Sequence, residues 1–286
     1  MLDILFTIFA MFAVVIFWVV LFDTNRFVVR HHRVHSPKIT KLCRAVVLSD
    51  LHNKKYGKDN EHLITAIKEL KPDFVLIAGD MVTSRKKAPT REAVKLLQQL
   101  QETYPIYYGV GNHEHRLFHI AKKYGTVGQE YLSALTKNGI APISNDSKVI
   151  ADSNIRVYGL DISGDYYERF QKKAMDEAYI QSLLGEPDGN CFNILLAHNP
   201  EYFPAYAQWG ADLTVSGHVH GGIIKVPLIN RGFISPAFTL FPKYDGGVFA
   251  EEGAEMVLSR GLGTHSIPVR LFNPGELWCV EFAPEE

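Results

Sequence analysis

The stretch AVVLSDLH, residues 45–52, is the most informative part of the sequence for the fold, because an apolar run is followed directly by two side chains that can bind a metal. A short apolar run such as Ala45–Leu48 is typical of a buried strand. Asp50 and His52 follow at once, and residues two apart in an extended segment project to the same side. The stretch therefore predicts a buried strand that brings a carboxylate and an imidazole to one edge of a sheet.

The rest of the chain alternates between strand and helix patterns. Further apolar runs that predict strands are Phe74–Ala78, Ile106–Val110, Arg156–Leu160, Ile194–Ala197 and Leu213–Val215. Helical patterns cover Glu61–Leu70, with Asn60 as the expected N-cap and Lys71-Pro72 as its end, then Pro89–Glu102 and roughly Tyr166–Leu184. This alternation predicts an α/β fold.

Metal-binding side chains follow five of the predicted strands. Besides Asp50 and His52, they are Asp80, Asn112 and His113, His198, and His218 with His220. Open α/β sheets bind ligands at the carboxyl ends of their strands, so we expect these donors to converge. Imidazoles with carboxylates suit Zn, Fe and Mn better than Ca or Mg. Two divalent ions against two carboxylates leave excess positive charge, which favours a bridging hydroxide and an anionic substrate.

These motifs resemble the calcineurin-like metallophosphoesterase superfamily. Its signature of D-x-H, G-D, G-N-H-[DE], H and G-H-x-H stands here as SDLH, AGD, GNHE, AHNP and SGHVH, within residues 45–221. The resemblance implies a four-layer α/β/β/α sandwich of two mixed sheets and two divalent metal ions, which would be Mn, Fe or Zn. It implies that Asp50, His52 and His220 bind one ion, that Asn112, His198 and His218 bind the other, and that Asp80 bridges them. His113 would be the general acid.

A closer similarity is to the membrane-anchored bacterial branch often called YkuE-like, which includes UDP-diacylglucosamine pyrophosphohydrolases. The segments that carry this similarity are 240–249 and 259–277. The run GDMVTSRK (79–86) lacks the RG motif of Ser/Thr protein phosphatases, and the marks of purple acid phosphatases are also missing.

Several further polar residues are weaker candidates. Glu114 is expected either to orient His113 by a hydrogen bond or to be exposed. Asn53 and His265 are candidates for substrate contact or for ordinary loop positions. Arg260 and Arg270 are expected in structural ion pairs, with phosphate binding as the alternative. His115 and His119 are expected at the surface.

Residues 4–22 carry no charge, and a helix over them would reach about 28 Å, close to the thickness of a bilayer core. Six basic residues follow this segment, with Asp23 as the only acid before residue 45, so the positive-inside rule predicts that the rest of the chain lies in the cytoplasm. We therefore expect a single-pass anchor over 1–24 in the cell membrane and a catalytic domain over 25–286. A cleaved signal peptide and a buried core helix are the alternatives. The alternation in FVVRHHRVH (27–35) predicts a short strand.

The composition narrows the function classes. The chain has 286 residues, of which 47% are hydrophobic, enough for one large domain. A net charge of −1 lacks the basic excess of nucleic-acid binders, so no nucleic-acid partner is expected. Three widely spaced cysteines predict free thiols in a reducing compartment. Oligomeric state stays open.

We therefore predict a dinuclear-metal hydrolase of phosphoester or pyrophosphate bonds, acting on a membrane-associated or lipid-linked substrate. The alternatives are a general phosphodiesterase or phosphatase of soluble substrates, a membrane-tethered nuclease, and a non-catalytic metal-binding scaffold.

Overall fold

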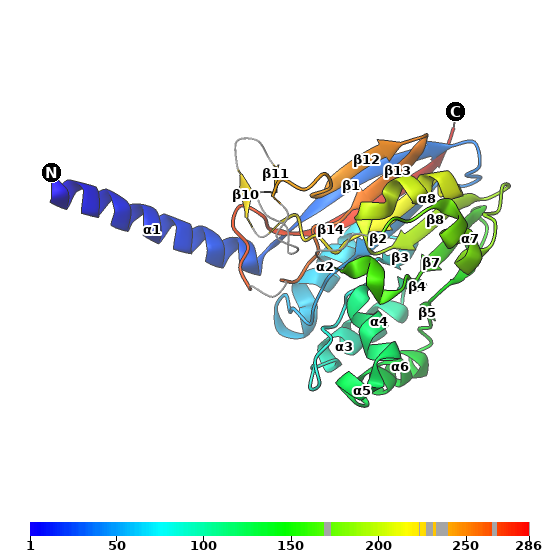
Figure 1. The fold of residues 1–286 in the computed structure, drawn as a ribbon, viewed down its shortest axis with the longest axis horizontal. Coiled ribbons are helices and arrows are strands. Elements are labelled where there is room, and N and C mark those ends of the chain that lie inside the picture. The colour runs from blue at the N-terminus through cyan, green and yellow to red at the C-terminus, as the bar shows by residue number, and fades with distance from the viewer. Residues whose placement is uncertain (169–172, 223, 227–230, 233–239, 265–267, 286) are drawn as a thin grey trace.

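Two six-stranded sheets form the centre of the computed structural model, which describes the chain except residues 169–172, 223, 227–230, 233–239, 265–267 and 286 (Figure 1). The first sheet has the order β1 (Phe27–Ser36), β14 (Gly275–Pro284), β2 (Cys43–Leu48), β3 (Phe74–Ile77), β4 (Ile106–Gly109) and β5 (Pro142–Ile143). The second has the order β12 (Gly247–Glu251), β13 (Ala254–Leu258), β9 (Leu213–Ser216), β8 (Phe192–Ala197), β7 (Ile155–Leu160) and β6 (Asp146–Ile150).

Both sheets are mixed. In the first sheet β2, β3, β4 and β5 run parallel, whereas β14 is antiparallel to β2 and parallel to β1. In the second, β13, β9, β8 and β7 run parallel, and the edge strands β12 and β6 are antiparallel to their neighbours. The parallel strands at the centre of each sheet end at a common edge, where ligands can gather.

Three apolar cores separate four layers. The first sheet packs its outer face against α2 (Glu61–Leu70), α3 (Arg91–Gln101) and α6 (Val127–Lys137). The second packs against α7 (Glu177–Leu184) and α8 (Phe203–Trp209). Between the sheets, side chains such as Val47, Leu76, Ile194 and Val215 are fully buried. The predicted four-layer α/β/β/α sandwich is confirmed.

The predicted strands are all present, and α2 has the predicted bounds. Asn60, however, does not cap α2 with its side chain. Its backbone is left-handed, with φ of 63°, and its Oδ1 accepts a hydrogen bond from the backbone N–H of Tyr56. The side chain thus closes the preceding loop instead of the helix.

The helix predicted over roughly Tyr166–Leu184 is wrong in the described part of its first half, while residues 169–172 lie outside the described residues. A short 3-10 turn, η2 (Gly164–Tyr167), ends at the extended residue Glu168, and α7 begins only at Glu177. Asp176 accepts a hydrogen bond from the backbone N–H of Tyr179 and so caps α7. This N-cap signal competes with the apolar spacing and determines where the helix starts.

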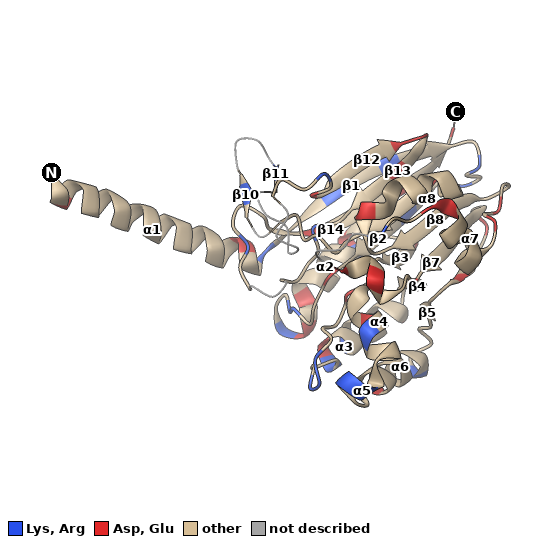
Figure 2. Cartoon of the chain, viewed as in Figure 1, with Lys and Arg blue, Asp and Glu red and all other residues tan. Residues whose placement is uncertain are grey.

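Helix α1 (Leu2–Asn25) extends away from the rest of the chain, and Figure 2 draws it without charge except near its two ends. Its large apolar side chains are exposed, and by length and composition it could cross a membrane. A signal sequence near the N-terminus has the same features. The strand predicted for 27–35 is β1, and the three cysteines are free and buried.

Candidate metal centre

The seven predicted metal ligands lie just beyond the ends of five parallel strands. Asp50 and His52 follow β2, Asp80 follows β3, Asn112 follows β4, His198 follows β8, and His218 and His220 follow β9. Strands β2, β3 and β4 belong to the first sheet, and β8 and β9 belong to the second, so both sheets contribute to the cluster. The structure brings the seven side chains together into two adjoining groups.

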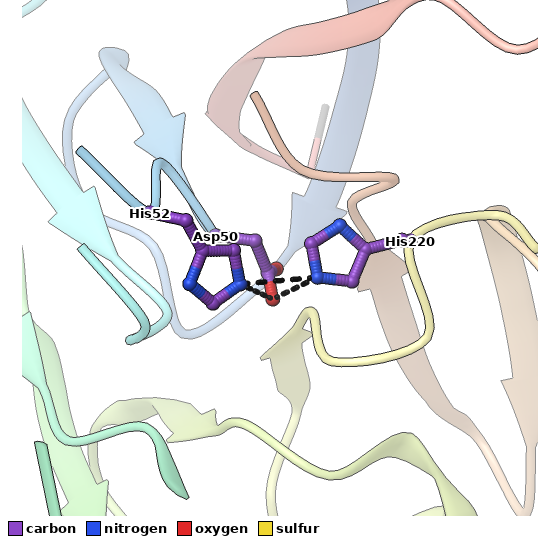
Figure 3. A group of neighbouring side chains, drawn as sticks. All are labelled: Asp50, His52 and His220. Carbon is purple, nitrogen blue, oxygen red and sulfur yellow. Dashed lines mark hydrogen bonds and ion pairs between the residues drawn. The ribbon is translucent and has the colours of Figure 1, made fainter. Parts of the chain in front are cut away.

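Asp50, His52 and His220 form the first group (Figure 3). Asp50 Oδ1 lies 3.2 Å from His220 Nε2 and 3.8 Å from His52 Nε2. The two Nε2 atoms are themselves 3.2 Å apart. Two imidazole nitrogens and a carboxylate oxygen that point at one spot are a donor set for a divalent transition metal.

Asp80, His198 and His218 form the second group, and Asn112 adjoins it. Asp80 Oδ2 lies 3.1 Å from His198 Nε2. The tip of the Asn112 amide lies 3.0 Å from His218 Nδ1, 3.2 Å from Asp80 Oδ2 and 3.3 Å from His198 Nε2. The amide can turn its N–H groups toward these three acceptors, or it can present its oxygen to a cation that all four groups share.

Asp80 stands between the groups. Its Oδ2 is 3.1 Å from His198 Nε2 on one side and 3.8 Å from His52 Nε2 on the other. Its Oδ1 accepts a hydrogen bond of 2.8 Å from the backbone N–H of His113. This position suits a carboxylate shared between two cations.

Backbone strain is concentrated in the cluster. Five of the seven residues have positive φ: Asp50 (50°), His52 (47°), Asp80 (56°), His218 (71°) and His220 (52°). Positive φ is uncommon for residues other than glycine and costs of order 1–3 kcal/mol each. Such strain persists where the surrounding structure fixes it, which is typical of a functional site.

Gly217 allows the second sheet to approach Asp50. A Cβ at this position would overlap Ser49 Oγ and Asp50 Oδ2. Both oxygens of Asp50 also accept from the backbone N–H of His218, at 3.1 and 3.2 Å. The missing side chain therefore lets the β9 end touch the carboxylate directly.

The charges of the metal-free cluster favour a cation. Burial alone would raise the pKa of Asp50, but His220 and His198 outweigh it and lower the pKa. Burial alone would lower the pKa of His198, but Asp80 and Asp50 raise it to about 10. Burial and His198 lower the pKa of His218 to about 3, so that its imidazole is neutral. A positive charge is thus strongly preferred beside the two carboxylates, and neutral imidazoles are available to bind it.

His113 lies at the second position of α4 (Asn112–His119), and its Nε2 is 3.9 Å from Asp80 Oδ2. The backbone N–H of Ser84 donates to His113 Nδ1 at 2.8 Å, and Ser84 Oγ is also 2.8 Å away. A neutral His113 ring therefore holds its proton on Nε2, the atom that faces the cluster. Sequence reasoning missed Ser84, which lies four residues after Asp80 in a loop that carries no distinguishing motif.

Glu114 does not bond to His113 as expected, nor is it exposed. It is fully buried, and its carboxylate accepts from the backbone N–H groups of Asp80 and Met81 at 2.8 Å each, from Gly111 at 3.2 Å and from Tyr108 Oη at 2.9 Å. Burial and Asp80 raise the pKa of Glu114 to about 7. Glu114 therefore fixes the loop after β3 to the start of α4, because its two carboxylate oxygens accept hydrogen bonds from backbone amides of both segments.

The two arginines have structural contacts. Arg260 forms the expected ion pair, with its NH1 3.4 Å from Glu276 Oε1. Among the described residues, Arg270 has no carboxylate partner, so the ion pair expected for it is not seen there. Its buried guanidinium donates to the backbone carbonyls of Arg260, Gly261, Gly263 and Asn273 and so fixes the loop beside Asp50.

The remaining candidates differ in position. Asn53 Nδ2 donates to Thr83 Oγ1 at 3.5 Å, while His265 lies outside the described residues. His119 is exposed, as expected, whereas His115 is only partly exposed, and both rings face Asp161. Tyr167, which sequence reasoning missed, packs its ring against His218 with centroids 5.2 Å apart.

Two mixed sheets with a cluster of histidine, aspartate and asparagine at their strand ends define a metal-dependent phosphoesterase class. The family model described as calcineurin-like phosphoesterase matches residues 43–222. The chain therefore belongs to the calcineurin-like phosphoesterases.

Curated relatives agree with this family. The chain is 25% identical over 250 residues to an uncharacterized metallophosphoesterase of Campylobacter jejuni, covering 85% of this chain but only 60% of that protein. It is 26% identical over 249 residues to the uncharacterized metallophosphoesterase YkuE of Bacillus subtilis, covering 82% and 77%. It is 22% identical over 291 residues to the UDP-2,3-diacylglucosamine pyrophosphatase LpxG of Chlamydia muridarum, covering 83% and 82%.

Proposed function

We propose that this chain hydrolyses phosphoester or pyrophosphate bonds in a lipid-linked substrate at a membrane surface, with two divalent metal ions. One observation supports the proposal most directly: a few hydrogen bonds connect the end of the apolar helix α1 to the loops that adjoin the metal-ligand cluster. The pyrophosphatase name of the Chlamydia muridarum relative gives secondary support.

The end of α1 is bonded to loops that adjoin the cluster. Lys54, two residues after His52, donates from Nζ to Asn25 Oδ1 at 2.8 Å. The backbone N–H of Arg270 donates to Thr24 Oγ1 at 3.1 Å, and its guanidinium donates to the backbone carbonyl of Gly261 at 3.0 Å. Gly261 packs so closely on Asp50 that a Cβ at this position would lie 2.6 Å from the Asp50 Cβ. A membrane around α1 would therefore lie next to the metal-binding edge of the sheets.

Apolar side chains are exposed in the same region. Ile224 pairs with Leu271, and Phe272 precedes Asn273, whose Nδ2 donates to the backbone carbonyl of His220. Ile224 and Phe272 are both more than a third exposed. Exposed apolar residues beside a membrane-anchoring helix favour contact with acyl chains.

The chain's own residues would act on the substrate as follows. Asp50, His52 and His220 would hold one cation, Asn112, His198 and His218 the other, and Asp80 would contact both. When bound, such cations polarise a phosphoryl group and supply activated water at neutral pH. His113, when its ring is protonated, would donate the proton on Nε2 to the leaving oxygen and become neutral, with Ser84 Oγ, 2.8 Å away, accepting from Nδ1–H.

The test is hydrolysis by the full chain in mixed micelles, with Mn, Fe and Zn each added. The panel holds a soluble phosphomonoester, a soluble phosphodiester and a nucleotide–lipid pyrophosphate. We expect the lipid pyrophosphate to have the highest kcat/KM, by about tenfold or more. Equal or faster cleavage of the soluble diester would contradict the lipid assignment and favour a general phosphodiesterase.

A further inference from the structure

A second group of metal-binding side chains lies on the far part of α4. His115 and His119 are four residues apart, so they project from the same face of the helix. Both face Asp161, which directly follows β7. His115 Nδ1 is 2.7 Å from Asp161 Oδ1, and His119 Nε2 is 3.4 Å from Asp161 Oδ2. The two imidazole rings have centroids 4.6 Å apart.

The carboxylate of Asp161 is held in place before any ion binds. Ser144 Oγ donates to Asp161 Oδ2 at 2.9 Å. Asn145 accepts from the Asp161 backbone N–H at 2.9 Å and donates to its carbonyl at 3.1 Å. The Asp161 side chain is 5% exposed, whereas that of His119 is 55% exposed. The group is therefore rigid on its carboxylate side and open to solvent on its histidine side.

We propose that His115, His119 and Asp161 form a third metal site, which binds a zinc ion or a similar first-row transition cation. Two histidines at this helical spacing with a carboxylate are a donor set that zinc prefers. Ligands at about 2.0–2.1 Å from a tetrahedral ion lie about 3.4 Å apart. The His119–Asp161 distance already matches this separation, and the His115–Asp161 distance needs to open by less than about 1 Å.

The site is separate from the seven-residue cluster. The donor atoms of His115 and His119 face Asp161, and none of the seven ligands belongs to this group. Tyr167 is close to both clusters: it packs on His218, and burial with the charges of Tyr206, Asp80 and Asp161 raises its pKa. The third ion would bind beside the catalytic cluster without replacing a ligand there.

The position of the site indicates its effect on the protein. Helix α4 begins with Asn112 and His113, and its other end carries His119. An ion held by His115, His119 and Asp161 would fasten α4 to the end of β7 in the second sheet. A cation is also favoured near the C-terminal end of a helix by the helix dipole. The ion would therefore stabilise the helix that presents the proposed general acid.

The test counts zinc in the full chain in detergent. The metal-stripped protein is equilibrated with buffered micromolar zinc, and bound zinc is measured by elemental analysis. We expect about three ions per chain in the parent and about two in His119→Ala and in Asp161→Asn. Because His119 is exposed, its replacement should not disturb folding. Zinc should also raise the Tm of the parent by more than that of His119→Ala.

Matched controls separate this site from other histidines. His31→Ala and His62→Ala remove histidines outside the group and should leave about three ions bound. A parent that binds only two ions, or a third ion that survives in both His119→Ala and Asp161→Asn, would overturn the proposal. The readout does not use turnover, so it is independent of the proposed reaction and of whether the lipid substrate is correct.

Discussion

His113 is the residue on which the proposed chemistry depends most directly. Its Nδ1 accepts from the Ser84 backbone, and its Nε2 faces the ligand cluster. His113→Ala should lower kcat by about 10²–10⁴-fold, the usual contribution of a positioned general acid, while both metal ions stay bound. Steady-state kinetics with parallel metal analysis measure this. His62→Ala, at an exposed helix position, is the control and should have parental activity.

Loss of metal together with activity in His113→Ala would contradict the assigned role. It would mean that His113 is a ligand, which its 3.9 Å distance from Asp80 Oδ2 leaves as the competing interpretation.

His198 gives the metal-free protein a pH-dependent stability. Its pKa is raised to about 10 by Asp80 and Asp50 in spite of burial, against about 6.5 in the unfolded chain. The protonated ring therefore stabilises the folded state fully below about pH 6.5, and this contribution is lost as the pH rises toward about 10. The difference in free energy of unfolding between metal-free parent and His198→Gln should shrink over that range. Denaturant titrations at several pH values measure it, and a constant difference would contradict the assignment.

Glu114 stabilises the join between β3 and α4. Glu114→Ala leaves several buried amides without an acceptor and removes one of the two partners of Tyr108 Oη, so the free energy of unfolding should fall by about 3 kcal/mol. Glu114→Gln keeps one acceptor oxygen and should lose less. Urea denaturation of the two variants compares them, and equal losses would show that the acceptor oxygens are not what matters.

At the scale of elements, the close approach of β9's end to Asp50 depends on a glycine. Gly217→Ala would push a methyl group into Ser49 and Asp50, so it should weaken metal binding and lower the free energy of unfolding by about 1–3 kcal/mol. Gly189→Ala is a matched control, because a Cβ there meets nothing within 4 Å. Metal titration and thermal unfolding report both effects. A Gly217→Ala protein that binds metal like the parent would show that the contact relaxes without consequence.

The strands were predictable from the sequence because each is a short apolar run followed by a polar motif. Ala45–Leu48 and Phe192–Ala197 need no long-range information to be recognised as buried. The ligand positions followed from the same pattern, since parallel strands end at one edge. The start of α7 was not predictable from the apolar spacing, because the hydrogen bond of the Asp176 N-cap determines where this helix begins.

Contacts between distant segments were not predictable. Glu114 was expected to orient its neighbour His113 or to be exposed, but two of its partners are the amides of Asp80 and Met81, more than thirty residues earlier in the chain. Arg270 likewise binds backbone carbonyls of a loop whose path depends on the packing of β14. The four-layer arrangement came from the family resemblance, since strand order cannot be derived from local apolar patterns.

For the whole molecule, α1 connects the proposed chemistry to a membrane. Removing residues 1–22 should leave hydrolysis of a soluble phosphomonoester within about twofold, because the cluster lies entirely after residue 49. Hydrolysis of the lipid-linked substrate in vesicles should fall by about tenfold or more, through lost local concentration. Paired assays on micelles and vesicles measure the two activities. Equal losses on both substrates would instead mean that α1 supports the fold through Thr24 and Asn25.

The pairing of β1 with β14 has a consequence for biosynthesis. β1 follows α1 directly and pairs along its full length with the final strand of the chain, which also separates it from β2. The first sheet therefore stays split until β14 (Gly275–Pro284) has left the ribosome, long after the apolar helix has been made. A truncation before Gly275 would leave β1 and β2 each with an open strand edge, a state prone to aggregation rather than a slightly shortened enzyme.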